Sequence, residues 1–249
     1  MLPGSGVIIT RPAAQAHALA RMIAAIGGRA ILFPALEILV CPPLPESRAA
    51  IEDADIAIFI SANAVEFGLR FAQASLPKSV KLAAIGKMTA QALRAAGYED
   101  IIMPQSGADS AALLANPALQ RVSGKRVVVF RGVGGRETLR DVLCQRGAKV
   151  AYIECYKRRQ PEVAARDLEE LTQRKDIAAI HFLSRETLHN FCNLIGPNLL
   201  QILRQKPVFA PHSAILDGAR TLGFDEGVLT EFGDEGLIAA LEQRFGTTP

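Results

Sequence analysis

The chain has 249 residues, enough for one large or two small domains. Hydrophobic residues make up 49% and charged residues 21%, as in an ordinary soluble globular protein, and the formal net charge of +3 is too small to indicate nucleic-acid binding. No apolar run approaches the roughly 20 residues of a membrane helix, and no signal-peptide pattern precedes the first strand pattern. We therefore expect a cytoplasmic protein without nucleic acid or membrane among its partners.

Short apolar runs alternate with helical patterns along the chain. The predicted strands are, in order, Val7 to Ile9, Ala30 to Phe33, Ile56 to Ile60, Lys81 to Ile85, Ile101 to Met103, Arg126 to Phe130, Lys149 to Glu154, Ala178 to Leu183, Pro207 to Ala210 and Glu226 to Leu229. The predicted helices between them include Ala13 to Ile26, Ala64 to Ala74, Thr89 to Ala96, Glu137 to Arg146 and Ile215 to Leu222. Because the strand runs are continuously apolar, they indicate parallel strands covered on both faces, hence a doubly wound α/β architecture. We expect left-handed helix caps at Gly27, Gly97, Gly147 and Gly223.

Three blocks of the sequence recur in the same order at nearly constant spacing. The matched pairs are Val7 to Arg11 with Val127 to Arg131, Ile58 to Ser61 with His181 to Ser184, and Ala84 to Gly86 with Ala210 to His212. A repeat of so long a period predicts two similar parallel-sheet α/β domains rather than a solenoid. Two such domains imply a cleft between them, and ligand sites are common in such clefts.

Two segments interrupt the alternation. Residues 37–45 are rich in proline, and residues 155–161 are basic and end at Pro161. Both follow the second strand of a repeat copy, so they predict two linkers and one discontinuous domain. The predicted domains are residues 1–36 with 160–249, and residues 40–154, joined by a two-stranded linker. Two sequential domains divided near Gly124 are the alternative.

A glycine-rich turn from Gly132 to Glu137 follows a strand and opens a helix. Such a turn binds phosphate or carboxylate in many α/β proteins, through free amides and the positive end of the helix dipole. It is not the dinucleotide fingerprint, because Glu137 stands at the position of the third glycine. A plain tight turn is the alternative, and the flanking Arg131 and Arg136 favour an anion site.

Ser61 and Ser184 follow predicted strands and precede predicted helices. Each is expected to be an N-cap, and this position also lines the ligand edge of an open α/β sheet. Thr89 follows a third turn of this kind, at Gly86, where it could cap its helix or offer a hydroxyl to a ligand.

Motifs for strong nucleophiles and metals are absent from the sequence. The four histidines have no metal-ligand spacing, there is no GxSxG, and the four cysteines contain no CxxC, which indicates reduced thiols. This predicts either a reaction that depends mainly on positioning a reactive substrate, or no reaction. Tyr156 lies in a predicted linker beside the inferred cleft, where it is either a hinge aromatic or a hydrogen-bond or proton donor.

The motifs together resemble one family. They are Ile9-Thr10-Arg11-Pro12, Phe59-Ile60-Ser61-Ala62-Asn63-Ala64-Val65, Ala84-Ile85-Gly86 with Thr89, Phe130-Arg131-Gly132 with Gly135-Arg136-Glu137, and Cys155-Tyr156 with Arg158. In this order the set resembles the uroporphyrinogen-III synthases over essentially the whole chain.

The resemblance implies a lyase of tetrapyrrole biosynthesis, which cyclises hydroxymethylbilane to uroporphyrinogen III with inversion of ring D and loss of water. It implies no metal or organic cofactor, and we expect a monomer. It implies Tyr156 as the catalytic residue. The substrate-binding positions that it implies are Thr10, Arg11, Ser61, Asn63, Gly86, Thr89, Arg131, Gly132, Arg136, Ser184, His212 and Ser213. The sequence departs from the pattern at Ile215, which stands where the repeat has Thr89; His212 or Ser213 could supply the missing polar group.

A second class of function is a non-catalytic two-lobed binding module for a small anionic ligand. Secreted modules of this kind carry a signal peptide and regulatory ones carry a DNA-binding segment, and the sequence shows neither pattern. A nucleotide-sugar transferase is a weaker third class.

Overall fold

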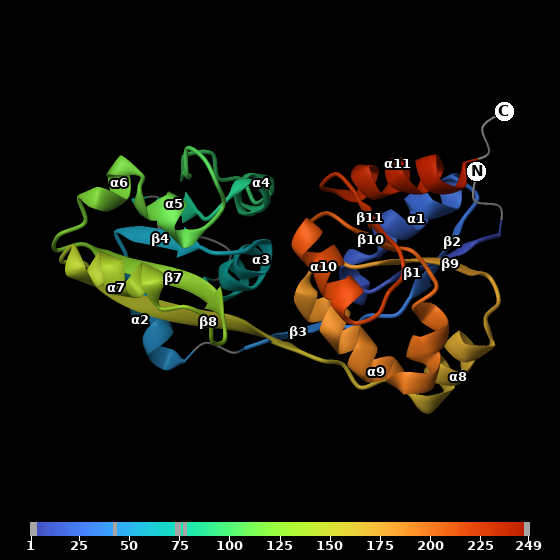
Figure 1. Cartoon of the computed structure of the whole chain (residues 1–249). Helices are drawn as coiled ribbons and strands as arrows, with labels where there is room; N and C mark the ends of the chain where they lie inside the picture. The colour runs from blue at the N-terminus through green and yellow to red at the C-terminus, as the bar shows by residue number, and fades with distance from the viewer. Residues whose placement is uncertain (1–3, 42–43, 73–75, 77–78, 247–249) are drawn as a thin grey trace. The chain divides into compact units, whose positions relative to one another are not determined.

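The computed structural model describes residues 4–41, 44–72, 76 and 79–246. The chain divides into two compact units: the first runs up to Glu37 and resumes at Arg159, and the second is Ile38–Arg158 (Figure 1). Each unit contains one largely parallel sheet with helices on both of its faces. The α/β class predicted from the sequence is therefore confirmed.

The first unit is built on a sheet with the strand order β11-β10-β9-β1-β2. Its strands are β1 (Gly6–Ile9), β2 (Arg29–Leu32), β9 (Ile177–His181), β10 (Val208–Ala210) and β11 (Gly227–Leu229). Its helices are the 3₁₀ turn η1 (Ala13–Gln15), α1 (His17–Ala25), α8 (Ala165–Gln173), α9 (Arg185–Leu203), α10 (Ser213–Thr221) and α11 (Asp234–Phe245).

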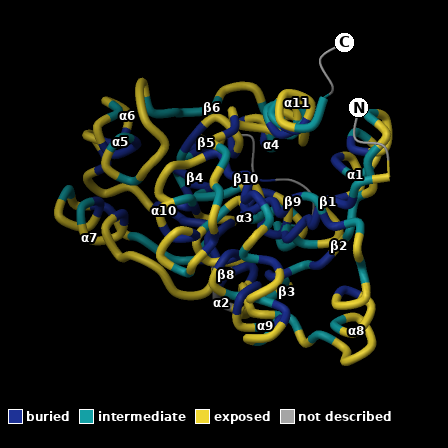
Figure 2. The backbone as a smooth tube through the Cα atoms, turned by 45° about the vertical axis from the view of Figure 1, so that its right-hand side comes forward, coloured by how far each residue is buried: buried dark blue, intermediate teal, exposed yellow. Residues whose placement is uncertain are grey.

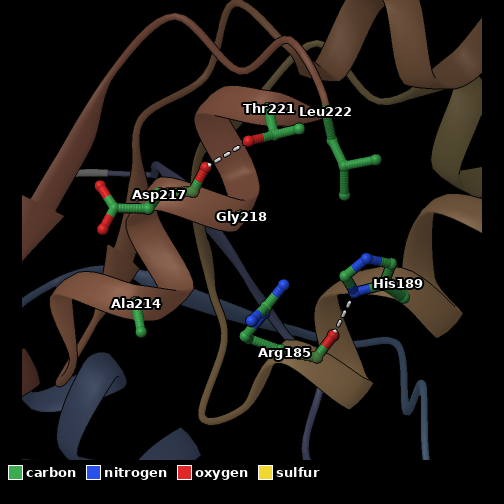
Figure 3. A pocket seen from close by; sticks show the side chains of 7 residues that line it. All are labelled: Arg185, His189, Ala214, Asp217, Gly218, Thr221 and Leu222. Atoms are coloured by element: carbon green, nitrogen blue, oxygen red, sulfur yellow. Dashed lines mark hydrogen bonds between the residues drawn. The ribbon is translucent and has the colours of Figure 1, made fainter.

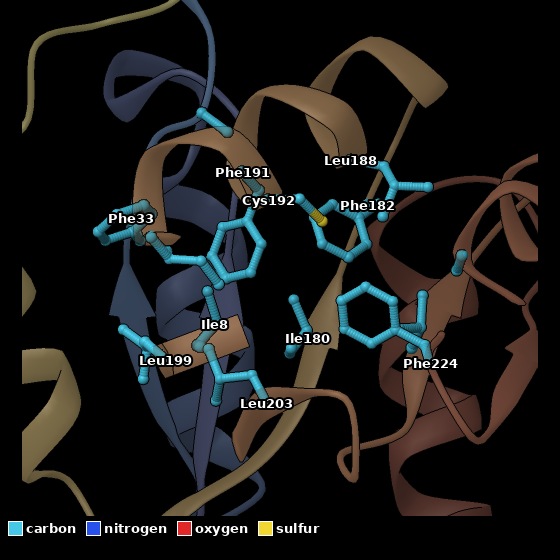
Figure 4. Packing of buried hydrophobic residues seen from close by; sticks show 14 of the residues in the cluster. Ile8, Phe33, Ile180, Phe182, Leu188, Phe191, Cys192, Leu199, Leu203 and Phe224 are labelled. Carbon is cyan, nitrogen blue, oxygen red and sulfur yellow. The ribbon is translucent and has the colours of Figure 1, made fainter. Parts of the chain in front are cut away.

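Both faces of this sheet are buried, which explains why its strands are apolar throughout. Successive side chains of a strand point to opposite faces. Ile8 therefore packs with α8, α9 and α10 in a cluster that includes Phe182, Phe191 and Phe224, as Figure 4 shows. Its neighbours Val7 and Ile9 pack against α1 and α11 on the other face.

The second unit is built on a sheet with the strand order β3-β8-β7-β4-β5-β6. Its strands are β3 (Glu37–Val40), β4 (Ile56–Phe59), β5 (Lys81–Ala84), β6 (Ile101–Ile102), β7 (Arg126–Gly132) and β8 (Lys149–Arg159). Its helices are α2 (Pro45–Glu52), α3 (Ala62–Phe71), α4 (Lys87–Ala95), α5 (Ser110–Leu114), α6 (Pro117–Gln120) and α7 (Thr138–Gln145). α2, α3 and α4 cover one face, and α5, α6 and α7 cover the other. In each unit the central strands are buried and the outward sides of the helices are exposed (Figure 2).

The two segments predicted as linkers form paired strands. Glu37–Val40 is β3, and residues 155–159 extend β8. The Cys41 amide donates to the Cys155 carbonyl at 3.1 Å, and Arg159 donates to Glu37 at 2.8 Å, so the two segments run antiparallel. Pro42 and Pro43 lie outside the described residues, and Pro45 begins α2 rather than ending a linker.

The repeat copies do not coincide with the compact units. β1 and β2 belong to the first copy and β9, β10 and β11 to the second, yet they share one sheet. β4, β5 and β6 of the first copy likewise share the other sheet with β7 and β8 of the second. Each unit is thus assembled from one part of each copy. The expected glycine caps are confirmed, because Gly27, Gly97, Gly147 and Gly223 have φ of 82°, 91°, 84° and 87°.

Candidate functional site

In open α/β sheets, ligands bind beyond the carboxyl ends of the strands, where the strand order changes direction. In the second unit this point lies between β4 and β7, because the chain proceeds outward from β4 to β5 and β6, and then from β7 to β8 on the other side. The helix after β4, α3, and the helix after β7, α7, cover opposite faces. Ser61 follows β4, and Gly132 ends β7. The candidate site is therefore built on these two residues.

Tyr156 reaches this point from the adjacent strand β8. Its hydroxyl lies 3.0 Å from the hydroxyl of Ser61, and its ring is buried, with 2% of the residue exposed. The ring packs against Phe67 at 6.1 Å between centroids and lies directly on Gly132. A Cβ at position 132 would lie 2.8 Å from two ring carbons, so only glycine leaves room for this ring position.

A β-bulge determines which face of the sheet Tyr156 occupies. Arg131 pairs with Glu154, but the next residue, Gly132, pairs with Tyr156, so Cys155 is the additional residue on β8. Without the bulge, adjacent residues would point to opposite faces. With it, Cys155 and Tyr156 both enter the cluster beneath α3, where Ser61 lies. Tyr156 is therefore held inside the sheet of the second unit, which differs from the linker position expected from the sequence.

The hydrogen bonds of Ser61 are compatible with a proton available at Tyr156, because either hydroxyl of the pair can be the donor. Ser61 is the N-cap of α3, as predicted, and its hydroxyl accepts a hydrogen bond from the Ala64 amide at 3.0 Å. When its own O–H donates to Tyr156, the phenol O–H is free to donate to a third group. A hydrogen bond received by the phenol oxygen also polarises that O–H. Asn63, in the first turn of α3, is partly buried and has an interaction of its own.

The glycine-rich turn after β7 is bound to carboxylates of the protein itself. The Gly134 amide donates to Glu154 at 3.2 Å, and Arg131 donates to Glu137 at 3.0 Å. The Arg131 side chain is 3% exposed and lies over the Tyr152 ring, 4.3 Å from its centroid. The geometry therefore favours a structural role for Arg131, whereas Arg136 is exposed.

The turn after β5 differs from the prediction in one respect. α4 begins at Lys87 and its N-cap residue is Gly86, so the expectation that Thr89 caps this helix is wrong. Thr89 lies inside the helix, with 4% of the residue exposed. Gly86 is also buried, and a Cβ there would lie 2.8 Å from the Cβ of Ala108, so this turn requires a glycine.

In the first unit the corresponding point lies between β1 and β9. The hydroxyl of Thr10 is buried and donates to the His181 carbonyl at 2.8 Å, which ties β1 to β9. Arg11 pairs with Asp234 of α11 at 2.8 Å, and its Nε is buried without a partner in the described part of the chain. Burial and, secondarily, the positive charge of Arg11 lower the pKa of His181 to about 3, so the ring is neutral near pH 7. These side chains stabilise the edge of the sheet rather than project from it.

Ser184, as predicted, is the N-cap of α9. Its hydroxyl accepts from the Thr187 amide at 3.1 Å, and Thr187 completes a capping box. His212 and Ser213, at the start of α10, are both exposed, while Ile215 is buried. His212 is the N-cap residue but makes no side-chain cap hydrogen bond.

A cavity of about 260 Å³ lies between α9 and α10. Arg185, His189, Asp217 and Thr221 line it together with apolar atoms, as Figure 3 shows. Asp217 is already paired with Arg220 at 3.1 Å, and the His189 ring contacts the Arg185 carbonyl at 2.7 Å. Sequence analysis did not indicate this cavity, because residues from two helices form it.

Within the described residues, no group of three or more histidine, cysteine, aspartate or glutamate side chains is arranged to hold a metal ion. In the same part of the chain, no helix combines the length and the apolar character needed to cross a membrane.

Comparison with known proteins identifies the family. A family model described as uroporphyrinogen-III synthase HemD matches residues 17–239. Curated uroporphyrinogen-III synthases are similar to the chain. The protein of Salmonella typhimurium is 37% identical over 158 residues, which are 61% of this chain and 64% of that protein. The match thus spans slightly less than two thirds of the length of the Salmonella protein. The Escherichia coli protein is 31% identical over 195 residues, 76% of this chain and 79% of that one.

Solved structures show the same fold. A uroporphyrinogen-III synthetase of Helicobacter pylori matches with a TM-score of 0.62 at 13% identity and covers 98% of this chain and 100% of that one. A mutant uroporphyrinogen III synthase of Thermus thermophilus matches with a TM-score of 0.60 at 18% identity, covering 96% and 100%. The fold, the family model and the curated relatives agree: the chain belongs to the uroporphyrinogen-III synthase family.

Proposed function

We propose that this protein cyclises hydroxymethylbilane to uroporphyrinogen III, with inversion of ring D and loss of water, in tetrapyrrole biosynthesis. Membership of the family supports the reaction and does not favour the non-catalytic binding module. The observation that carries the mechanism is the contact of 3.0 Å between the hydroxyls of Tyr156 and Ser61, at the point where the strand order changes direction.

The first chemical step breaks the bond between carbon and the leaving hydroxyl of the bilane. The pyrrole nitrogen supplies electrons and an azafulvene forms, while the phenol proton of Tyr156 passes to the hydroxyl, which departs as water. The azafulvene carbon then bonds to the substituted α-carbon of ring D. The older bond from that carbon to the rest of the chain breaks and re-forms at the unsubstituted α-carbon, which closes the macrocycle with ring D inverted. When the pyrrole regains its aromaticity, a carbon-bound proton is released, which restores the phenol.

Most of the rate enhancement then comes from holding the far end of the chain near the correct carbon of ring D. Acid assistance to a departing group is typically worth about 10²–10⁴-fold, and we expect the low end because the pyrrole already expels the hydroxyl. The exposed His212, Ser213 and Arg136 are proposed to bind the substrate carboxylates. Thr10, Arg11, Gly86, Thr89, Gly132 and Ser184 are proposed to shape these surfaces, mainly through the backbone. A cytoplasmic location, a monomer and a reaction without metal or organic cofactor stay predictions.

Replacement of Tyr156 by phenylalanine tests the mechanism, because it removes only the hydroxyl. We expect Tyr156→Phe to lower the rate of uroporphyrinogen III formation about ten- to a hundredfold, with little change in the melting temperature. Tyr152→Phe is the matched control on the same strand, since its hydroxyl contacts the Arg140 amide at 3.3 Å, away from Ser61. The assay separates the inverted isomer from the uninverted isomer that forms without catalysis. A wild-type rate in folded Tyr156→Phe would reject the proton-donor role.

A further inference from the structure

Exposed apolar side chains gather beyond the carboxyl ends of the strands. Of the nine large apolar side chains that are exposed among the described residues, six end a parallel strand or follow one within a few residues. These six are Leu32, Met88, Val133, Leu183, Leu229 and Phe232. Single exposed apolar residues need no explanation, but their concentration at the edge where α/β sheets bind ligands does.

Two of them follow the strands on either side of Ser61. In the sheet, β4 lies between β7 and β5. Val133 follows β7 and is 54% exposed, Ser61 follows β4, and Met88 follows β5 and is 72% exposed. Because the three strands are parallel, their carboxyl ends lie at the same edge, so the two apolar residues follow strands on opposite sides of Ser61, whose hydroxyl Tyr156 reaches from β8.

These two positions are held by fixed backbone. The Val133 amide donates to the Tyr156 carbonyl at 2.8 Å, which continues the pairing of β7 with β8. Met88 is in the first turn of α4, whose start is fixed by the tight packing of Gly86 against Ala108. The apolar side chains are therefore presented on ordered backbone and are not carried by a free loop.

Positive charge accompanies the apolar side chains. Lys87 precedes Met88 and is exposed, and Arg136 is exposed three residues after Val133. The two carboxylates that contact the turn are already occupied, because Glu137 pairs with Arg131 and Glu154 of β8 accepts from the Gly134 amide. The surface thus combines apolar contact with available cations, which suits a ligand made of flat rings with carboxylate arms.

We infer that Met88 and Val133 contact pyrrole rings of the substrate on the two sides of Ser61, and that Lys87 binds one of its carboxylates. The inference rests on the proposed function and adds three substrate-binding residues to it. Pyrrole rings pack on the thioether of Met88 and the isopropyl group of Val133, while the ammonium of Lys87 makes an ionic contact that weakens with added salt.

Steady-state kinetics of three variants and two controls test the inference. Met88→Ala removes most of the apolar contact, so we expect the KM for hydroxymethylbilane to rise about fivefold with kcat nearly unchanged, whereas Met88→Leu keeps a KM near that of the wild type. Ile202→Ala is the control, an exposed apolar residue on α9. Lys87→Ala should raise KM about two- to fivefold at low salt and much less at high salt. Lys81→Ala is its control, because Lys81 is exposed at the amino end of β5.

A binding measurement separates contact from catalysis. The chain has no tryptophan, so Met88→Trp introduces a single reporter. We expect its emission to change on anaerobic titration with uroporphyrinogen III, and the emission of Ile202→Trp to stay constant.

Wild-type protein that produced no uroporphyrinogen III would overturn the proposed function, and this inference with it. An active wild type whose Met88→Ala and Lys87→Ala variants kept its KM, together with a silent reporter in Met88→Trp, would overturn this inference alone.

Discussion

Gly132→Ala perturbs the candidate site without altering any of its polar groups. The added Cβ would lie 2.8 Å from Cε2 and Cζ of Tyr156. Carbon atoms in contact are normally about 3.5–4.0 Å apart, so the ring would have to withdraw by roughly 0.7–1.2 Å. Gly132 does not have positive φ, so the consequence is steric rather than conformational. The withdrawal would draw the phenol away from its position 3.0 Å from the Ser61 hydroxyl.

A displacement of about 1 Å in a reacting group can cost about 10²-fold in rate. We therefore expect kcat for uroporphyrinogen III formation to fall about ten- to a hundredfold, with KM changed little. Overpacking of a core of this kind typically costs about 1–3 kcal/mol of stability, which denaturant unfolding would report. Gly6→Ala is the matched control, because its Cβ would lie 2.5 Å from Cδ1 of Ile31 in the other unit, and it should lose stability but keep kcat.

The double variant Gly132→Ala/Tyr156→Phe shows whether the loss acts through the phenol. If it does, the double variant is no slower than Tyr156→Phe alone, because the group that is displaced has already been removed. If the rate losses of the two single variants multiplied in the double variant, or if folded Gly132→Ala kept the wild-type kcat, the reasoning would be refuted.

Two further predictions concern charge. Arg131→Ala should lower the free energy of unfolding by about 1–3 kcal/mol without changing KM, because the partners of Arg131 are Glu137 and the Gly132 carbonyl of the protein itself. Arg136→Ala, in contrast, should raise KM in a salt-dependent manner. A higher KM in folded Arg131→Ala would contradict the structural role of Arg131. The lowered pKa of His181, about 3 in the folded protein, means that its contribution to stability is complete above its unfolded pKa of about 6.5 and is lost as the pH falls toward 3. Wild-type stability should therefore fall about 1.4 kcal/mol per pH unit more steeply than that of His181→Gln between roughly pH 6 and 4, measured by urea unfolding, and equal slopes would show that the residue does not titrate in this way.

The sequence alone determined much of the local structure and indicated the family. Continuous apolar runs predicted the parallel strands, since a strand buried on both faces must be apolar at every position. Ser61 and Ser184 were predicted as caps because a hydroxyl before a helix satisfies free amides at its start, and both make that hydrogen bond. The order of the motifs indicated the family, which the comparisons confirm.

Only the tertiary structure decided which side chains meet. A bulge of one residue at Cys155 places Tyr156 beside Ser61, and strand patterns contain no signal for it because a bulge depends on the partner strand. Arg131 and Arg136 are both arginines beside one turn, yet the fold buries the first over Tyr152 and exposes the second. The repeat showed that the chain contains two similar copies, but pairing between distant strands placed parts of both copies in each sheet. Spacing along the chain fixes backbone geometry within an element, whereas the partner of each strand and the burial of each charge depend on contacts between residues far apart in the sequence.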